Sequence, residues 1–302
     1  MASPHQPTKL KVMEMLNHIN KRVKDQLSIK LPLKELLVLY RLPNADPAVR
    51  NFSFIYIGMA HEHATLQEQA EVVPELLLGI SKVRAHHQDE FLRMAAKGLE
   101  QYSSRMRTDN LAVKYAFVGD KADCNLFLEF CLQTLLYQPV SVSQEGTAAA
   151  DAPPTAPPGL SLDQATRVRG KSVLRGEELV KRKLGLLNFV GDLELGADLL
   201  YPLFLVASVD NNEKVSKRGD ELLKRKTTGV NLEDPNLIRR LLNIYLGIPS
   251  NTAVEANARV TPAGPALKTR LMATFTRSIA AANEFPLTLQ CVFDCISGEC
   301  LH

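Results

Sequence analysis

Residues 201–218 read Tyr-Pro-Leu-Phe-Leu-Val-Ala-Ser-Val-Asp-Asn-Asn-Glu-Lys-Val-Ser-Lys-Arg, and this stretch decides the fold class. The apolar run after Pro202 predicts a helix that opens at this proline, because proline lacks the N–H that has no partner in a first helical turn. Asp210 predicts a short turn, since its carboxylate can accept bonds from the N–H groups that start a following helix. That second helix begins near Val215. The stretch therefore predicts a helical hairpin.

The same outline recurs along the chain. Pro32 and Pro74 are 42 residues apart, and Pro202 and Pro286 are 84 residues apart, each at the start of an apolar run. A period of about 40–47 residues with two helices per unit is typical of HEAT and armadillo arrays. The proline spacing and the surrounding hairpins together indicate a repeat protein.

Helical periodicity also predominates elsewhere. Asp234-Pro235 predicts the start of a helix that ends at Gly247. After the Thr261–Pro265 loop, a further helical stripe is predicted to run as far as Ile279. No run of alternating apolar and polar residues joined by hairpin turns indicates a sheet. The predicted fold class is all-α, a HEAT-type α-solenoid.

One segment interrupts the helical pattern. Residues 141–170 are rich in Pro, Ala, Gly and Ser, which bury too little apolar surface to offset the entropy of ordering. We therefore expect a flexible Pro/Ala-rich insertion, disordered between two helical blocks. The expected organisation is a disordered N-terminus at 1–8, a helical block at 9–140, the insertion at 141–170 and a helical block at 171–302.

Composition limits the class of function. The formal charge of +3, from 36 basic and 33 acidic residues, does not supply the field that a nucleic-acid binder needs. No apolar run approaches the ~18 residues expected of a membrane span. Five cysteines fit a reducing compartment, so a cytosolic or nuclear location is expected. Cys124 and Cys131, seven apart, are predicted to be small core side chains.

Three long stretches resemble a known family. Residues 11–24 (Lys-Val-Met-Glu-Met-Leu-Asn-His-Ile-Asn-Lys-Arg-Val-Lys), 183–189 (Lys-Leu-Gly-Leu-Leu-Asn-Phe) and 261–283 are similar to the N-terminal region of the Ecm family of large proteasome adapter and scaffold proteins. The resemblance covers nearly the whole chain apart from the insertion. It implies a HEAT-repeat solenoid that binds the proteasome, tethers its core and regulatory particles, and takes part in assembly quality control. Because the family members are far longer, we expect the chain to hold their N-terminal repeats.

The HEAT pattern assigns structural roles to individual positions. Pro202, Asp210 and Val215 fall where HEAT repeats place a proline of the first helix, an aspartate of the turn and a valine of the second helix. In an earlier repeat, Val49 and Arg50 fit the pattern and Asp46 lies in the turn, but Asn44 stands at the aspartate position and Leu36 at the proline position. A basic residue is usual where Ser216 stands, so a regular Asp–Arg ladder between units is not expected.

Several short motifs resemble phosphate-binding or metal-binding sites but lack residues that such sites need. Gly170-Lys171-Ser172 lacks the glycine five residues earlier that a phosphate loop needs. His61-Glu62-His63 and His86-His87 lack further ligands at metal-site spacing, which favours solvated polar positions. Cys291 and Cys295, with Cys300 and His302, would need a tail that folds back to complete a zinc site. Buried helix positions and a frayed end are the simpler interpretation.

Charged runs are interpreted as solvated helix faces. Lys181-Arg182-Lys183 and Lys224-Arg225-Lys226 have glutamates nearby, and Arg218-Gly219-Asp220 lies within a predicted helix. The exposed candidates for partner contact are Lys181, Arg182, Lys224 and Arg225. The sequence assigns none of them to a partner.

The sequence favours a non-enzymatic scaffold over an enzyme. We expect no catalytic, cofactor-binding or metal-binding residue and no small-molecule substrate. The expected partners, by resemblance, are the proteasome core and regulatory particles. The alternative is a transport or trafficking adaptor of the same HEAT architecture that binds other protein cargo, because fold does not fix function.

Overall fold

The computed structural model describes residues 30–102, 111–137, 176–248 and 263–297, together with scattered helical positions between 11 and 22. These positions fall at the start of the predicted helical block at 9–140. The predicted segments 1–8 and 141–170, the Gly170-Lys171-Ser172 motif, Cys300 and His302 lie outside the described residues. Two compact units divide the chain, Met1–Gln101 and Tyr102–His302. This division falls inside the first predicted helical block.

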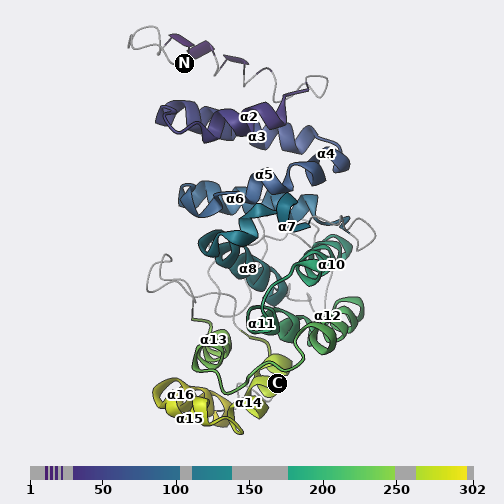
Figure 1. Ribbon diagram of the computed structural model, residues 1–302, viewed down its shortest axis with the longest axis vertical. Coiled ribbons are helices and arrows are strands. Elements are labelled where there is room, and N and C mark those ends of the chain that lie inside the picture. Colours follow the sequence, from purple (N-terminus) through teal and green to yellow (C-terminus); the bar gives the residue numbers. More distant parts are fainter. Residues whose placement is uncertain are drawn as a thin grey trace, which may run out of the picture. The chain divides into compact units, whose positions relative to one another are not determined.

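Unit 1 consists of two packed groups of helices. Its described elements are α2 (Leu33–Arg41), α3 (Pro47–His63), α4 (Leu66–Glu71), α5 (Val73–Leu77), a 3-10 turn η1 (Ile80–Lys82) and α6 (Ala85–Gly98). Helix α2 packs on α3, while α4 and α5 both pack on α6 (Figure 1). Unit 1 is therefore built from neighbouring helical pairs.

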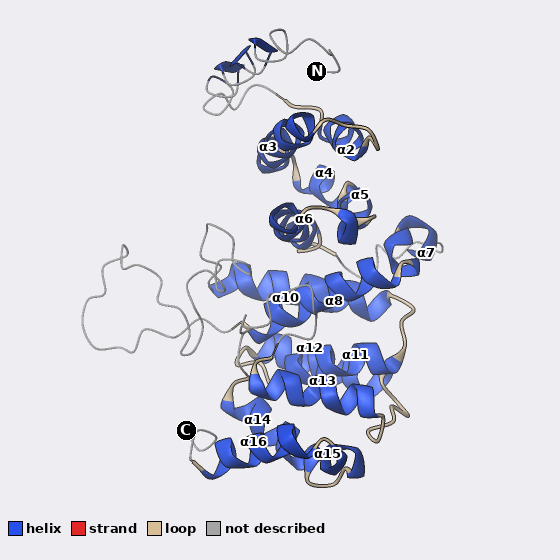
Figure 2. Ribbon diagram, turned by 90° about the vertical axis from the view of Figure 1, so that its left-hand side faces the viewer, coloured by secondary structure: helices blue, strands red, loops and turns tan. Residues whose placement is uncertain are grey.

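Unit 2 repeats this principle over a longer segment. Its described elements are α7 (Leu111–Lys114), η3 (Ala116–Gly119), α8 (Lys121–Leu136), α10 (Gly176–Asp192), α11 (Ala197–Ala207), α12 (Glu213–Lys226), α13 (Pro235–Leu246), α14 (Pro265–Phe275), α15 (Ile279–Asn283) and α16 (Phe285–Ile296). Helix α11 contacts both α8 and α12, and α13 contacts α14, α15 and α16 (Figure 2). The fold class is all-α, a solenoid of paired helices, and no strand occurs in the described ranges.

Three of the four spaced prolines stand at helix starts as predicted. Pro32 is the residue before α2, and Pro74 and Pro286 are the second residues of α5 and α16. The expectation for Pro202 is wrong, because α11 begins at Ala197 and holds this proline in its interior. The helical turn that precedes Pro202 is stabilised because it buries Leu200, which is 1% exposed. The bond that Pro202 cannot donate would have gone to the carbonyl of an exposed residue, where water can replace it.

The helix ends show how local sequence sets the boundaries. Asp234 caps α13 by accepting from two backbone N–H groups, and Gly247 ends it with a left-handed φ of 66°, as predicted. The cap of α12 is Asn212, not Asp210: the Asn212 side chain accepts from the N–H groups of Lys214 and Val215. The helix predicted to reach Ile279 ends instead at Phe275, and a new cap, Ser278, starts α15.

Each unit has an apolar interior made by the inward stripes of its helices. Val49 in unit 1 and Val215 in unit 2 are buried, at 9% and 0% exposure. Cys124 and Cys131 are buried on one face of α8, as their spacing predicts. None of the described helices is both long enough and apolar enough to span a bilayer.

Candidate functional site

The seam between the two helical groups of unit 1 is an aromatic cluster around His87. Its ring stacks on Phe54 with centroids 3.8 Å apart and an interplanar angle of 21°. Tyr40 and Phe91 meet edge to face at 5.1 Å, and the Tyr40 hydroxyl lies 2.7 Å from His87 Nδ1. Burial, and then the charges of His86 and Arg84, lower the pKa of His87 to about 4. The cluster therefore joins α2, α3 and α6 through a neutral imidazole.

The predicted solvation of the histidine clusters is wrong for two of the four residues. His87 is 2% exposed because it lies one helical turn before Phe91 on the inner face of α6. His61 is 3% exposed at the end of α3, and its carbonyl accepts from Gln69 Nε2 at 2.7 Å. His63 and His86 are exposed, as predicted.

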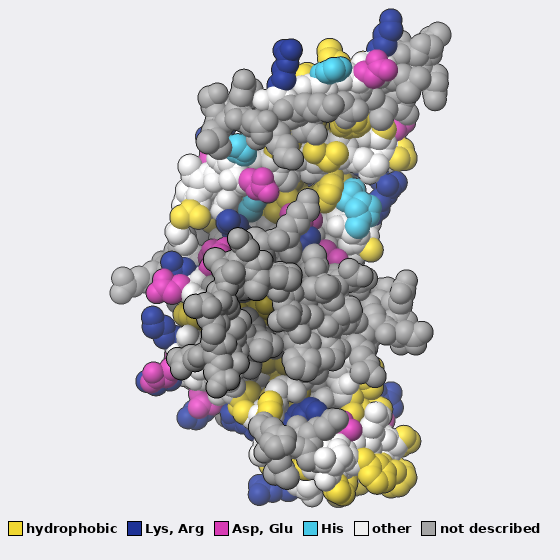
Figure 3. All heavy atoms as spheres, turned by 180° about the vertical axis from the view of Figure 1, so that it is seen from behind, with side chains coloured by type: hydrophobic (Ala, Val, Ile, Leu, Met, Phe, Trp, Pro, Cys, Tyr) yellow, Lys and Arg dark blue, Asp and Glu magenta, His cyan; other side chains and the backbone are white. Residues whose placement is uncertain are grey.

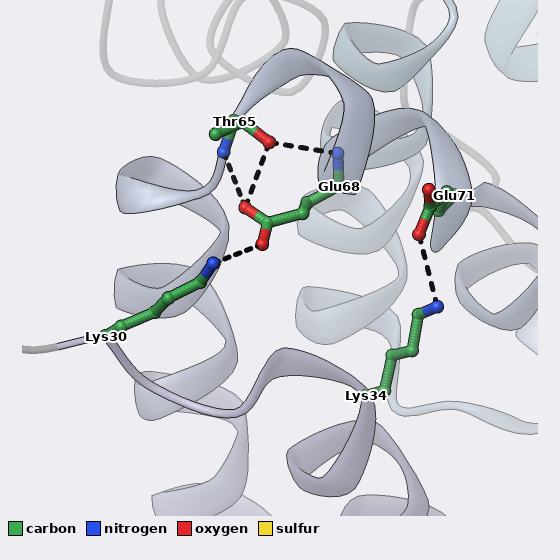
Figure 4. Close-up of polar contacts among 5 residues, drawn as sticks. All are labelled: Lys30, Lys34, Thr65, Glu68 and Glu71. Carbon is green, nitrogen blue, oxygen red and sulfur yellow. Dashed lines mark hydrogen bonds and ion pairs between the residues drawn. The ribbon is translucent and has the colours of Figure 1, made fainter.

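A groove of about 420 Å³ opens where the start of α2 faces α4. Apolar side chains of Leu33, Ala60 and Val72 line it together with charged residues. Figure 4 shows two ion pairs that join its sides: Lys30 Nζ lies 2.5 Å from Glu68 Oε1, and Lys34 Nζ lies 3.3 Å from Glu71 Oε2. Both ion pairs are substantially exposed. They therefore specify how the two sides of the groove meet more than they stabilise the fold.

Glu68 has a second role at the start of α4. Its carboxylate accepts from the Thr65 backbone N–H at 2.9 Å while the Thr65 hydroxyl accepts from the Glu68 N–H, a reciprocal capping box (Figure 4). The hydrogen bond from Lys30, followed by those from Thr65, lowers the pKa of Glu68 to about 2. The carboxylate is thus held ionised, as a cap and an ion-pair partner.

Unit 2 contains a polar contact of a different kind, a buried ion pair. Lys183 Nζ of α10 lies 2.5 Å from Asp210 Oδ2, and the two side chains are 3% and 5% exposed. The same ammonium donates to the Leu135 carbonyl at 3.0 Å, near the end of α8. Asp210 also accepts from the Asn212 N–H at 2.8 Å. Burial lowers the pKa of Lys183, and the charge and hydrogen bond of Asp210 oppose that change.

This contact links successive helical pairs. Lys183 belongs to α10, whereas Asp210 lies in the turn between α11 and α12. A turn aspartate thus meets a cation from the preceding helical pair of the same unit, although the ladder was not expected from the sequence. The helical period would have identified Lys183 as an inward-facing residue, because Lys183 lies four residues after Leu179 and three before Leu186. Both leucines are buried.

The predicted repeat positions of unit 1 make local contacts instead. Asp46 caps α3 by accepting from the Ala48 N–H at 2.8 Å. Arg50 donates to the carbonyls of Leu42 and Pro43 at 3.1 and 3.0 Å. These carbonyls belong to the turn that precedes α3. In unit 1, therefore, the arginine stabilises the turn of its own hairpin.

The basic runs divide between the interior and the surface. Arg182 is 5% exposed, so its predicted place on a solvated face is wrong. The reason is geometric, since Arg182 and Lys183 adjoin the inner face that α10 turns toward its neighbours. Lys181, Lys224 and Arg225 are exposed. Within Arg218-Gly219-Asp220, Gly219 lies where α12 approaches the backbone of α11.

The described residues do not bring metal-ligating side chains together. No group of three His, Cys, Asp or Glu side chains in the described ranges could hold a metal ion. Cys291 is buried and Cys295 is half-buried on α16. Burial raises the pKa of the Cys124 and Cys131 thiols, which disfavours the reactive thiolate. The side-chain contacts described above are packing contacts, hydrogen bonds and ion pairs.

Comparison with known proteins supplies a family. A family model described as "Proteasome component ECM29, N-terminal" matches residues 1–302. The human "Proteasome adapter and scaffold protein ECM29" is 30% identical over 99% of the chain, which covers 17% of that protein. The fruit fly "Proteasome-associated protein ECM29 homolog" is 24% identical over 99% of the chain, which covers 15% of that relative. No solved structure matches the chain.

Proposed function

The chain belongs to the family described as proteasome component ECM29, N-terminal, and on this premise we propose that it is a proteasome-binding scaffold segment. In this proposal, it contributes to tethering the core and regulatory particles and to the quality control of their assembly. The observation that carries the proposal is the family match over residues 1–302, together with a human relative named as a proteasome adapter and scaffold protein.

The architecture supports binding through an extended surface. Paired helices bury one stripe against neighbouring helices and present the opposite face to solvent. Many contacts along such a surface can hold a large partner without covalent chemistry. The outward side chains of α12, which include Lys224 and Arg225, lie on a surface of this kind.

We propose that the segment acts without catalysis. Two polar pairs in the described interior are engaged in packing contacts: His87 faces Tyr40, and Lys183 faces Asp210. A general base or nucleophile needs a perturbed side chain that opens into a substrate cavity. The 420 Å³ groove of unit 1 is instead bordered by lysines and glutamates that pair with each other.

Binding can be tested with the purified 302-residue chain and purified proteasome particles. The chain is mixed with core particles, with regulatory particles and with both, and each mixture is separated by sedimentation. We expect the chain to migrate with proteasome particles. If it binds neither particle, the proposal is wrong; if it binds only one, this segment does not tether on its own.

A second measurement addresses the contact surface. Lys224→Glu with Arg225→Glu reverses two exposed charges on α12, and Lys97→Glu with Lys121→Glu reverses two exposed charges elsewhere. A loss of binding confined to the first variant would assign the contact to α12. Recovery of vesicle coats or nuclear-transport factors from a lysate, without proteasome subunits, would favour the cargo-adaptor alternative.

A further inference from the structure

Two arginine side chains of unit 1 are anchored near the start of α3. Arg50 belongs to α3 itself, and its Nη2 donates to the carbonyls of Leu42 and Pro43 at 3.1 and 3.0 Å. Arg84, the residue before α6, donates from Nη1 to Asn51 Oδ1 at 3.3 Å. Because Asn51 directly follows Arg50 in α3, both guanidinium groups are held at the same end of this helix.

The charges of these two arginines are not balanced by carboxylates. Their hydrogen bonds go to backbone carbonyls and to a side-chain amide oxygen, all of which are neutral. Within the described part of the chain, neither Arg50 nor Arg84 forms an ion pair. The first turns of α3 and α6 contain no acidic residue, although helix starts favour negative side chains. Asp46, in the same turn, is engaged as the cap of α3.

The positive field of this region acts on the buried Tyr40. Burial raises the pKa of the Tyr40 phenol, and three positive charges oppose that change, in the order Arg50, Arg84 and Arg41. No carboxylate of the described residues contributes to this balance. Figure 3 shows histidine side chains next to Lys or Arg side chains at the right-hand edge of unit 1. The start of α3 therefore has a positive electrostatic potential.

An exposed leucine adjoins the two guanidinium groups. Leu42 is 45% exposed, and its carbonyl is one of the two that hold Arg50. A surface that combines two cations with an apolar side chain fits a protein segment better than a nucleic acid, whose binding requires a series of phosphate contacts. The planar guanidinium of arginine also matches a carboxylate through two parallel hydrogen bonds.

We propose that Leu42, Arg50 and Arg84, which we call the arginine patch, form a docking surface for an acidic segment of a partner protein. Carboxylates of the segment accept from the two guanidinium groups, and an apolar side chain of the segment packs on Leu42. Each guanidinium carries more N–H donors than its present contacts use, so it can hold its neutral partner and a carboxylate together. The patch is separate from the exposed face of α12, and the proposal does not rest on proteasome binding.

The test uses the complete chain and the fluorescence anisotropy of a labelled synthetic peptide. The peptide holds a single leucine flanked on both sides by glutamates, and the control peptide has glutamine in place of every glutamate. We expect the acidic peptide to bind at least about tenfold more tightly than the control at low ionic strength. This difference should diminish in high salt, because salt screens exposed charges.

Three variants locate the binding on the patch. Arg84→Gln removes one charge but keeps an amide that can donate to Asn51, and it should weaken binding of the acidic peptide by about tenfold. Arg50→Lys keeps the charge but loses the planar fork, and it should weaken binding by about threefold. Lys97→Gln removes an exposed charge near the other end of α6 and should leave binding unchanged.

The proposal is overturned if the acidic peptide binds no better than its glutamine control. It is also overturned if Lys97→Gln weakens binding as much as Arg84→Gln, because the chain would then respond only to net charge. Tighter binding of a single-stranded oligonucleotide of equal charge would assign the patch to phosphates and contradict a protein partner. Circular dichroism of each variant distinguishes lost binding from lost structure, and the comparison of the two peptides needs no variant.

Discussion

Unit 1 and unit 2 join their neighbouring helical pairs with different chemistry. In unit 1, the seam consists of aromatic rings around a neutral His87, with Lys–Glu pairs at the exposed edge. In unit 2, it contains an ammonium and a carboxylate, Lys183 and Asp210, that are both withdrawn from water. An architecture of paired helices thus tolerates either kind of seam, but the cost of losing one partner differs greatly.

The largest effect is expected for Asp210→Ala in unit 2. Removal of the carboxylate leaves the Lys183 charge buried with the Leu135 carbonyl as its remaining partner, which should cost about 3–5 kcal/mol of unfolding free energy. Hydrogen exchange of the α10–α12 amides and chemical denaturation followed by circular dichroism would measure this loss.

A double variant distinguishes the loss of the ion pair from the burial of an unpaired ammonium. Lys183→Met with Asp210→Ala removes both ions, and we expect it to recover most of the lost stability, because apolar replacement of a buried ion pair is often neutral. If the double variant is as unstable as Asp210→Ala, the cost does not arise from an unpaired ammonium. The contrast between the two units would then disappear.

Acid should weaken unit 1 through His87. The unfolded imidazole takes up a proton near pH 6.5, whereas burial delays protonation in the folded state to a pKa of about 4. Between these values the unfolded chain binds more protons, so stability falls as the pH is lowered, by about 3 kcal/mol in total. Above pH 6.5 this contribution is fully present.

The matched variants for this prediction are Tyr40→Phe with His87→Phe, and His86→Gln. The first removes the titrating ring together with its hydroxyl partner and should flatten the pH dependence of exchange in α2, α3 and α6. The second changes the exposed neighbour and should preserve most of that dependence. An unchanged slope in the first variant would show that other groups control the acid response.

Alanine in place of a glycine at a close helix contact should destabilise the two units by similar amounts. A Cβ on Gly98 of unit 1 would lie 2.5 Å from the Gln69 carbonyl oxygen, and one on Gly219 of unit 2 would lie 2.5 Å from the Ser208 nitrogen. Since backbone atoms cannot move aside, alanine at either site should cost about 1–3 kcal/mol. Alanine at Gly191 meets the flexible Leu222 side chain and should cost less. Thermal unfolding of the three variants gives the order.

The sequence predicts the helical pairs well because their signals are local. Asp234 and Gly247 mark both ends of α13, and the valines Val49 and Val215 lie on buried stripes as expected. The prediction for Pro202 fails because a proline can be accommodated inside a helix whose preceding turn buries Leu200. Local rules therefore establish which segments are helical better than they establish where each helix starts.

The seams could not be predicted because their partners are remote in sequence. Lys183 and Asp210 are 27 residues apart, and Tyr40 and His87 are 47 apart. A basic run or a histidine pair is also typical of a solvated face, so Arg182 and His87 were expected outside. What distinguishes Lys183 and His87 is their register with buried neighbours on the same helix, which composition alone does not show.

The smallest effect is expected at the exposed edge of unit 1. Lys34 and Glu71 have side chains that are 59% and 45% exposed, so water already solvates both ions. Replacing Glu71 with Gln should leave the unfolding free energy nearly unchanged, and any change should diminish further in high salt. A double-mutant cycle with Lys34→Met measures the coupling directly. Coupling comparable to that of Lys183 with Asp210 would mean that exposure does not explain why the two units respond differently.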